Sequence, residues 1–205
     1  MNKREAKEII VSLSDPGKMP CYGYSLPAAA CKVGSKLRTV EGSVCHGCYA
    51  HKGNYARFPL VQKQLYKRLE AISDPRWVEA MTVLVKGMPY FRWHDSGDIQ
   101  SEKHLNDIFD VCENTPNTKH WIPTREYEIV ENVIKNRSKP KNLALRLSAH
   151  MVDETGPIIL AKKLGVTISE VGTVKYTCPA PDQGNKCQEC RVCWGKRFNV
   201  TYRLH

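Results

Sequence analysis

The sequence predicts an α/β fold, a partial (open) parallel β/α barrel with irregular cysteine-rich segments at both ends. Short apolar strands alternate with amphipathic helices in the middle of the chain, which is typical of a parallel sheet covered by helices. The 205 residues are fewer than the ~250 that a closed eight-fold barrel takes. A hydrophobic content of 41% matches a globular core and excludes a disordered, collagen-like or coiled-coil chain.

We expect one domain over residues 1–205, with a cysteine-rich segment at 1–58, an α/β core at 59–176 and a second cysteine-rich segment at 177–205. No apolar run approaches the ~18 residues that a membrane span needs. The polar start of the chain is unlike a signal peptide. These features predict an unexported, cytoplasmic protein with no membrane partner.

Five helices are expected in the core, because apolar residues recur there at helical spacing. Asp74-Pro75 offers an N-cap followed by proline at the first helical position, and Ser101 offers another N-cap. Cys112 completes the apolar face of the helix that Ser101 begins, so we interpret it as a buried core thiol. The predicted ranges are 61–72, 74–86, 101–112, 129–134 and 157–164.

Four strands are expected, at 90–93, 120–122, 143–147 and 166–171. In parallel α/β sheets the binding site lies beyond the carboxyl ends of the strands. Each predicted strand ends in polar groups: 94–98, 123–126, 148–150, and Ser169 with Glu170. One such residue has an ordinary explanation as a turn or helix cap, but four polar strand ends together predict a ligand site. The catalytic candidates are Asp95, Asp98, Arg125 and Glu126.

Nine cysteines are the most informative feature of the chain. Disulfides are rare in reducing compartments, and an odd number of cysteines cannot pair completely within one chain. Metal or cluster ligation is the better explanation. The eight expected ligands form two groups of four, namely Cys21, Cys31, Cys45 and Cys48 near the start and Cys178, Cys187, Cys190 and Cys193 near the end.

The cysteine spacing favours one or two [4Fe–4S] clusters, with zinc as the alternative. Cys187, Cys190 and Cys193 follow a C-x2-C-x2-C pattern, which suits separate corners of an iron–sulfur cube. Zinc sites more often use two separated cysteine pairs. The N-terminal group is equally compatible with zinc, and one site could also draw cysteines from both ends of the chain.

Several motifs together resemble the phage-encoded "gene product 88" family over nearly the whole chain. They are Cys45-x-x-Cys48-Tyr49-Ala50, the run from Phe91 to Asp98, Thr124-Arg125-Glu126-Tyr127, Arg146-Leu147-Ser148-Ala149 and Cys178-Pro179-Ala180-Pro181. That family has no settled activity. The resemblance implies a phage protein located in the host cytoplasm.

A Cys-x-x-Cys-Tyr-Ala loop ahead of a partial barrel is also distantly similar to radical S-adenosylmethionine enzymes. In that superfamily three cysteines hold a [4Fe–4S] cluster, and the open iron binds the cosubstrate. The resemblance implies that Cys45 and Cys48 are cluster ligands. It also implies that Asp98, or Asp95, accepts the amino group of S-adenosylmethionine and that Ser148 contacts its ribose.

The chain departs from that superfamily in its cysteine spacing. The usual C-x3-C-x2-C motif is absent, since the cysteine before Cys45 is Cys31. If Cys21 were also a ligand, all four irons would be capped and no iron would remain for a cosubstrate. A capped cluster transfers electrons or supports structure.

The formal net charge of +10 suits a nucleic-acid partner, because neutralising phosphates releases counterions. Three hypotheses follow. The first is an iron–sulfur protein that holds nucleic acid or a nucleotide near its strand ends. The second is a zinc-stabilised nucleic-acid-binding module without catalysis, in which Trp93 and Trp121 could stack on bases, although their strand positions favour core packing. The third is an active radical S-adenosylmethionine enzyme acting on nucleic acid or a peptide.

Overall fold

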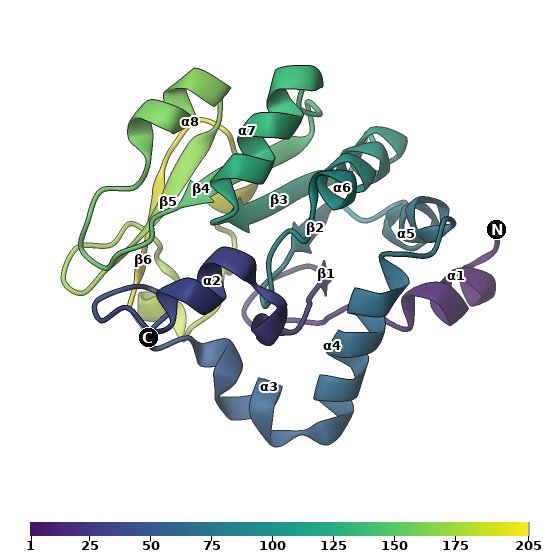
Figure 1. Cartoon of the computed structure of the whole chain (residues 1–205), viewed down its shortest axis with the longest axis horizontal. Coiled ribbons are helices and arrows are strands. Elements are labelled where there is room, and N and C mark those ends of the chain that lie inside the picture. The colour runs from purple at the N-terminus through teal and green to yellow at the C-terminus, as the bar shows by residue number, and fades with distance from the viewer. Residues whose placement is uncertain (205) are drawn as a thin grey trace.

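A six-stranded parallel sheet organises the chain in the computed structural model, which describes residues 1–204 (Figure 1). The strands lie in sequence order across the sheet, and the sheet is open. This confirms the predicted α/β class and the open parallel sheet. The strands are β1 (Gly23–Tyr24), β2 (Tyr90–Trp93), β3 (Lys119–Thr124), β4 (Leu143–Ser148), β5 (Thr167–Gly172) and β6 (Val200–Arg203).

Helices α5 to α8 follow one another along one face of the sheet, and α2, α3 and α4 lie below them in Figure 1. The α-helices are α1 (Lys3–Ile10), α2 (Lys32–Leu37), α3 (Gly53–Arg57), α4 (Pro59–Ala71), α5 (Trp77–Val85), α6 (Glu102–Asn114), α7 (Tyr127–Asn136) and α8 (Ile158–Leu164). Four short 3-10 helices complete the elements, η1 (Ala28–Ala30), η2 (Tyr49–His51), η3 (Ala180–Gln183) and η4 (Val192–Trp194).

The two faces of the sheet carry different side chains, because successive residues of a strand point to opposite faces. Phe91, Ile122 and Leu145 belong to the buried apolar cluster that packs against the helices. Arg92 and Arg146 alternate with those residues along β2 and β4 and face the other way. The sheet therefore has an apolar helical face and a polar, aromatic inner face.

All five predicted helices and four predicted strands are present, with small shifts at their ends. Helix α5 begins at Trp77 rather than Asp74 because the Asp74 carboxylate accepts a hydrogen bond from the Arg76 N–H at 2.8 Å and closes a turn first. Ser101 caps α6 as predicted, accepting from the His104 N–H at 3.1 Å. Cys112 is buried in the apolar core, which confirms its interpretation.

The expectation of irregular structure over residues 1–58 is wrong in part. That segment contains α1, β1, α2 and α3. Asn2 and Glu5 form a reciprocal capping box at the start of α1. Both outer strands of the sheet, β1 and β6, were also absent from the prediction. No helix within residues 1–204 has the length and apolar character needed to cross a membrane.

Candidate functional site

Three thiols gather beside the carboxyl ends of the strands. Cys31 directly precedes α2, and Cys45 and Cys48 lie in the loop before η2. Each of the three pairs is close enough for one thiol to raise the pKa of another. Gly34 lies against two of them, since a Cβ added there would be 3.6 Å from the Sγ atoms of both Cys31 and Cys45.

The surroundings of these thiols combine burial with charge. Burial raises the pKa of Cys31, and the Asp98 and Glu126 carboxylates raise it further. Burial also raises the pKa of Cys45, whereas the Arg125 guanidinium lowers it. These raised pKa values keep Cys31 and Cys45 protonated at neutral pH.

Asp98 is the most firmly held carboxylate of the site. It is buried, and it accepts hydrogen bonds from the Thr124 hydroxyl at 2.6 Å, the Ile99 N–H at 2.8 Å and the Arg125 N–H at 3.0 Å. Burial raises its pKa to about 6, although these three donors oppose the rise. The network ties the loop after β2 to the end of β3.

Glu126 connects the end of β3 to the helix that follows Cys31. Its carboxylate accepts a hydrogen bond from the Val33 N–H in the first turn of α2 at 2.9 Å. The side chain of Cys31 provides no such cap. A carboxylate at a helix start satisfies a free N–H group and interacts favourably with the helix dipole. Glu126 thus fixes the helix that follows Cys31.

Asp95 occupies a separate hydrogen-bond network. Its carboxylate accepts from the hydroxyls of Ser25 and Tyr55, and its backbone carbonyl accepts from the Tyr49 hydroxyl. Ser25 follows β1, and both tyrosines lie in the segment after the Cys45–Cys48 loop. Asp95 therefore links two parts of the N-terminal region to the end of β2.

The end of β4 meets the middle of β5 through hydroxyl groups. The Ser148 and Ser169 Oγ atoms are 2.9 Å apart, and Tyr127 donates to the Ser148 carbonyl. Arg125 reaches the same region and donates from Nε to the Ala149 carbonyl at 3.1 Å. The imidazole of His150 stacks on Tyr127 with ring centroids 4.5 Å apart.

The second cysteine group draws on both ends of the chain. Burial raises the pKa of Cys187, and the neighbouring Cys178 and Cys190 thiols raise it further. Burial also raises the pKa of Cys193, with a smaller contribution from Cys178. Burial raises the pKa of Cys21 to about 12, although the Arg92 guanidinium opposes the rise. The Cys187 thiol also raises it, which places Cys187 near Cys21. The Cys187 N–H also donates to the Lys18 carbonyl at 2.9 Å.

Arg146 fastens this C-terminal segment to the inner face of the sheet. It is fully buried on β4 and donates hydrogen bonds to carbonyls of the segment at 2.7 to 3.3 Å. The acceptors are Val192, Cys193, Gly195 and Phe198. The Trp194 indole donates to the Phe91 carbonyl at 3.0 Å and packs edge-on against Trp121. Trp93 and Trp121 are both buried, so they are packing residues rather than exposed stacking platforms.

Neither thiol group converges on a single point. Within residues 1–204, no three His, Cys, Asp or Glu side chains come together closely enough to hold one metal ion. In a tetrahedral zinc site with Zn–S bonds of about 2.3 Å, the sulfurs would be about 3.8 Å apart. Thiolates on an iron–sulfur cube are more widely spaced, because each binds a different iron.

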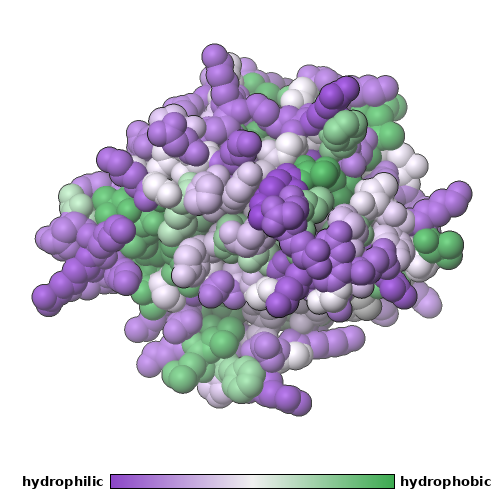
Figure 2. Space-filling view, turned by 180° about the vertical axis from the view of Figure 1, so that it is seen from behind, coloured by the Kyte–Doolittle hydropathy of each residue, from purple (hydrophilic) through white to green (hydrophobic). Residues whose placement is uncertain are grey.

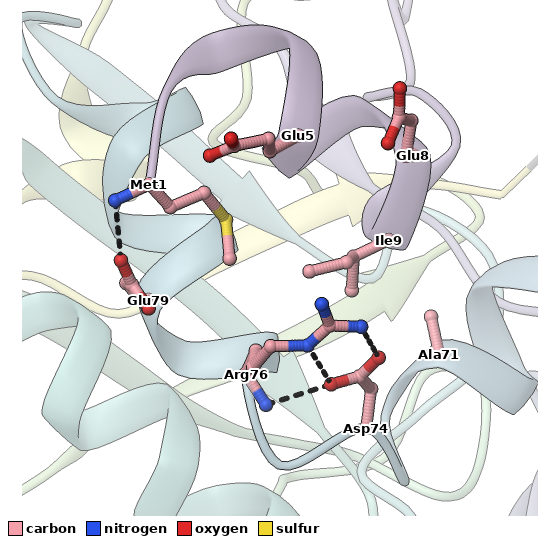
Figure 3. Close-up of a pocket in the computed structure, with 8 residues that line it drawn as sticks. All are labelled: Met1, Glu5, Glu8, Ile9, Ala71, Asp74, Arg76 and Glu79. Carbon is pink, nitrogen blue, oxygen red and sulfur yellow. Dashed lines mark hydrogen bonds and ion pairs between the residues drawn. The ribbon is translucent and has the colours of Figure 1, made fainter.

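A surface hollow of about 540 Å³ lies elsewhere, between α1, the end of α4 and α5 (Figure 3). Both cations that line it are paired with carboxylates of the same hollow. The Met1 ammonium contacts Glu79 at 2.6 Å, and Arg76 contacts Asp74 at 2.9 Å. None of the predicted site residues lines it.

Three of the four catalytic candidates lie near the N-terminal thiols. Asp98 and Glu126 raise the pKa of Cys31, and Arg125 lowers that of Cys45, whereas Asp95 and Ser148 belong to neighbouring networks. Sequence reasoning missed Arg146, although a charge inside the apolar run 143–147 was a signal that it contacts something specific. It also missed Ser25 and Tyr55, which carry no such signal.

The fold and the site define an open parallel α/β protein with two groups of cysteines at its margins. Within that class the chain belongs to the Gene product 88 family, whose model matches residues 1–196. This confirms the resemblance to a family of phage gene products. No curated protein and no solved structure gives a significant match, so the likeness to radical S-adenosylmethionine enzymes gains no support from the comparisons.

Proposed function

We propose that this chain is an iron–sulfur protein that binds two [4Fe–4S] clusters. Cys31, Cys45 and Cys48 would hold the first cluster. The C-terminal cysteines, Cys178, Cys187, Cys190 and Cys193, would hold the second. Thiolates are the ligands that such clusters prefer in proteins, and the C-x2-C-x2-C spacing of Cys187, Cys190 and Cys193 favours a cube over a single zinc ion.

The position of Cys21 determines how many protein thiolates the first cluster would have. Cys21 lies with Cys187 rather than with the three thiols near Asp98. The first cluster would then have three protein thiolates, which leaves one iron for a ligand that the chain does not supply. Asp98 and Arg125, one of each charge, lie close enough to affect the pKa of these thiols and would orient such a ligand.

A radical S-adenosylmethionine enzyme is the second candidate function. A single observation favours it: Asp98, the residue that the distant resemblance assigns to the cosubstrate amino group, lies beside a group of three cysteines. The Asp98 carboxylate would accept hydrogen bonds from that amino group. Formation of 5′-deoxyadenosine by the reduced protein would test this activity apart from cluster binding.

Iron and sulfide analysis of anaerobically purified protein tests the main proposal. We expect ~8 iron and ~8 sulfide per chain. Cys31→Ser, Cys45→Ser or Cys48→Ser should each remove about half of both. Cys112→Ala is the matched control, because it removes a buried thiol outside both groups, and it should leave the iron content unchanged. Colourless protein with stoichiometric zinc and no sulfide would overturn the proposal.

A further inference from the structure

We propose that residues 32–69 form a surface that binds single-stranded nucleic acid next to the three-thiol site. The inference rests on the proposed function in one respect, since the bound strand would be the partner that this surface presents to the first cluster. The surface comprises α2, the Cys45–Cys48 loop, α3 and most of α4.

The charge of the chain is concentrated in this surface. Residues 32–69 contain eight Lys and Arg and a single acidic residue, Glu41, a formal +7 out of the +10 of the whole chain. Arg68 is buried, and the other seven basic residues are exposed. The exposed residues are Lys32, Lys36, Arg38, Lys52, Arg57, Lys63 and Lys67.

These charges lack acidic partners. Within residues 1–204, every ion pair lies outside 32–69, and basic residues such as Arg76, Lys103 and Arg137 are paired with carboxylates. A basic surface without acidic neighbours attracts polyanions, because bound phosphates replace condensed counterions. Charge complementarity therefore selects an anionic partner.

Exposed apolar side chains stand among the charges. Phe58 is 48% exposed, Leu60 74% and Tyr66 46%. Phe58 directly precedes α4, and Leu60 and Tyr66 lie on it, beside Lys63 and Lys67. Helices α3 and α4 form the lower edge of the molecule in Figure 1, and Figure 2 shows apolar groups next to hydrophilic ones along the same edge.

The mixture of cations and aromatic rings favours a single strand. Aromatic side chains stack on unpaired bases, and lysines and arginines follow the phosphate backbone. A duplex would leave the rings of Phe58 and Tyr66 without unstacked bases. An acidic protein would use the charges but not the planar faces of these rings.

Fluorescence anisotropy of a labelled oligothymidylate of about 20 nucleotides, titrated with the full chain at several salt concentrations, tests the surface. Combined Lys52→Gln, Lys63→Gln and Lys67→Gln should weaken binding about tenfold and reduce the salt slope by about 2, as expected for three lost phosphate contacts. Combined Lys3→Gln, Lys7→Gln and Lys86→Gln removes the same charge from exposed positions elsewhere and should leave the slope unchanged.

Phe58→Ala and Tyr66→Ala should weaken binding several-fold while the salt slope stays constant, because base stacking is not ionic. Three results would overturn the inference: equal losses of affinity in the two triple-lysine variants, tighter binding of polyglutamate than of the oligonucleotide, or binding without salt dependence. Iron is measured on the same samples. If the protein holds its full iron content but does not bind the oligonucleotide, this inference is wrong and the proposed function stands. If colourless protein binds the oligonucleotide, the proposed function is wrong and this inference stands.

Discussion

Buried histidines illustrate how individual residues set the conditions under which this fold is stable. The His104 ring is fully buried on α6, and its Nδ1 accepts a hydrogen bond from the Gln100 N–H at 3.2 Å. The His94 ring is 5.3 Å away, and Trp77 packs edge-on against His104. Protonating Nδ1 would place its N–H opposite the Gln100 N–H, so that two donors face each other, and it would bury a positive charge. Burial, with a smaller contribution from Lys103, accordingly lowers the pKa of His104 to about 3.

We therefore predict that stability declines in acid. The pKa of His104 is lower in the folded chain than its ordinary value of 6.5. The contribution of His104 to the free energy of unfolding is therefore complete above pH 6.5 and is lost as the pH falls toward 3. The free energy of unfolding should fall by up to about 1.4 kcal/mol per pH unit from this residue. Urea unfolding at pH 7, 6 and 5 measures the slope.

His104→Asn keeps an acceptor for the Gln100 N–H and should reduce this slope by the part that His104 contributes. A slope from His94 and His120 should remain, because burial lowers the pKa values of both rings as well. The variant will also be less stable at pH 7. His46→Asn, at an exposed ring, is the control and should leave the slope unchanged. An identical slope in wild type and His104→Asn would show that the acid sensitivity arises elsewhere.

Local signals predicted the middle elements well and the outer ones badly. Helix α6 has an N-cap and a regular apolar face, and β4 is a continuous apolar run, so both could be found from the sequence. Strand β1 has only two residues, too few to show alternation. Strand β6, Val-Thr-Tyr-Arg, is half polar and depends on pairing with β5.

The same limit explains the cysteine grouping. Cys21 is ten residues before Cys31 in the sequence, which suggests that they belong together. However, Cys21 lies two residues before β1, and the segment that carries Cys187 contacts the loop before that strand through the hydrogen bond from the Cys187 N–H to the Lys18 carbonyl. Only long-range packing separates Cys21 from the N-terminal group. The separation of Cys21 from the other N-terminal cysteines therefore could not be predicted from the sequence.

Glu126 gives a prediction for α2. This helix is six residues long and too short to be stable alone, so its carboxylate cap matters. Glu126→Ala should destabilise the chain by about 1 kcal/mol and lower the iron content of the first site, because Cys31 directly precedes α2. Glu126→Gln retains an acceptor oxygen and should restore most of both. Unfolding free energy and iron per chain are the measurements.

Equal iron content in Glu126→Ala and wild type would contradict this role for the cap. Glu128→Ala supplies the control. Glu128 is an exposed carboxylate two residues away in the first turn of α7, so the substitution removes the same charge without touching α2.

At the scale of the whole molecule, the C-terminal segment completes the inner face of the sheet. Strand β6 pairs with β5, the Thr177 and Cys178 N–H groups donate to the Thr201 carbonyl, and Trp194 reaches β2. Between these anchors, residues 184–199 contain only the single 3-10 turn of η4. A segment with so little regular structure depends on side-chain anchors and on any metal that its thiols bind.

We predict that combined Cys187→Ser, Cys190→Ser and Cys193→Ser releases this segment while the helical layer stays folded, because the proposed cluster would supply folding free energy there. Hydrogen–deuterium exchange should show fast exchange over 184–199 and continued protection of α6 and β4, with iron reduced by about half. Arg146→Met keeps the thiols but removes the donor of several part-buried carbonyls, at a cost of about 1 kcal/mol for each, so it should release the same segment. A triple-serine variant with wild-type protection over 184–199 would mean that packing alone holds the segment and that its thiols bind nothing essential to the fold.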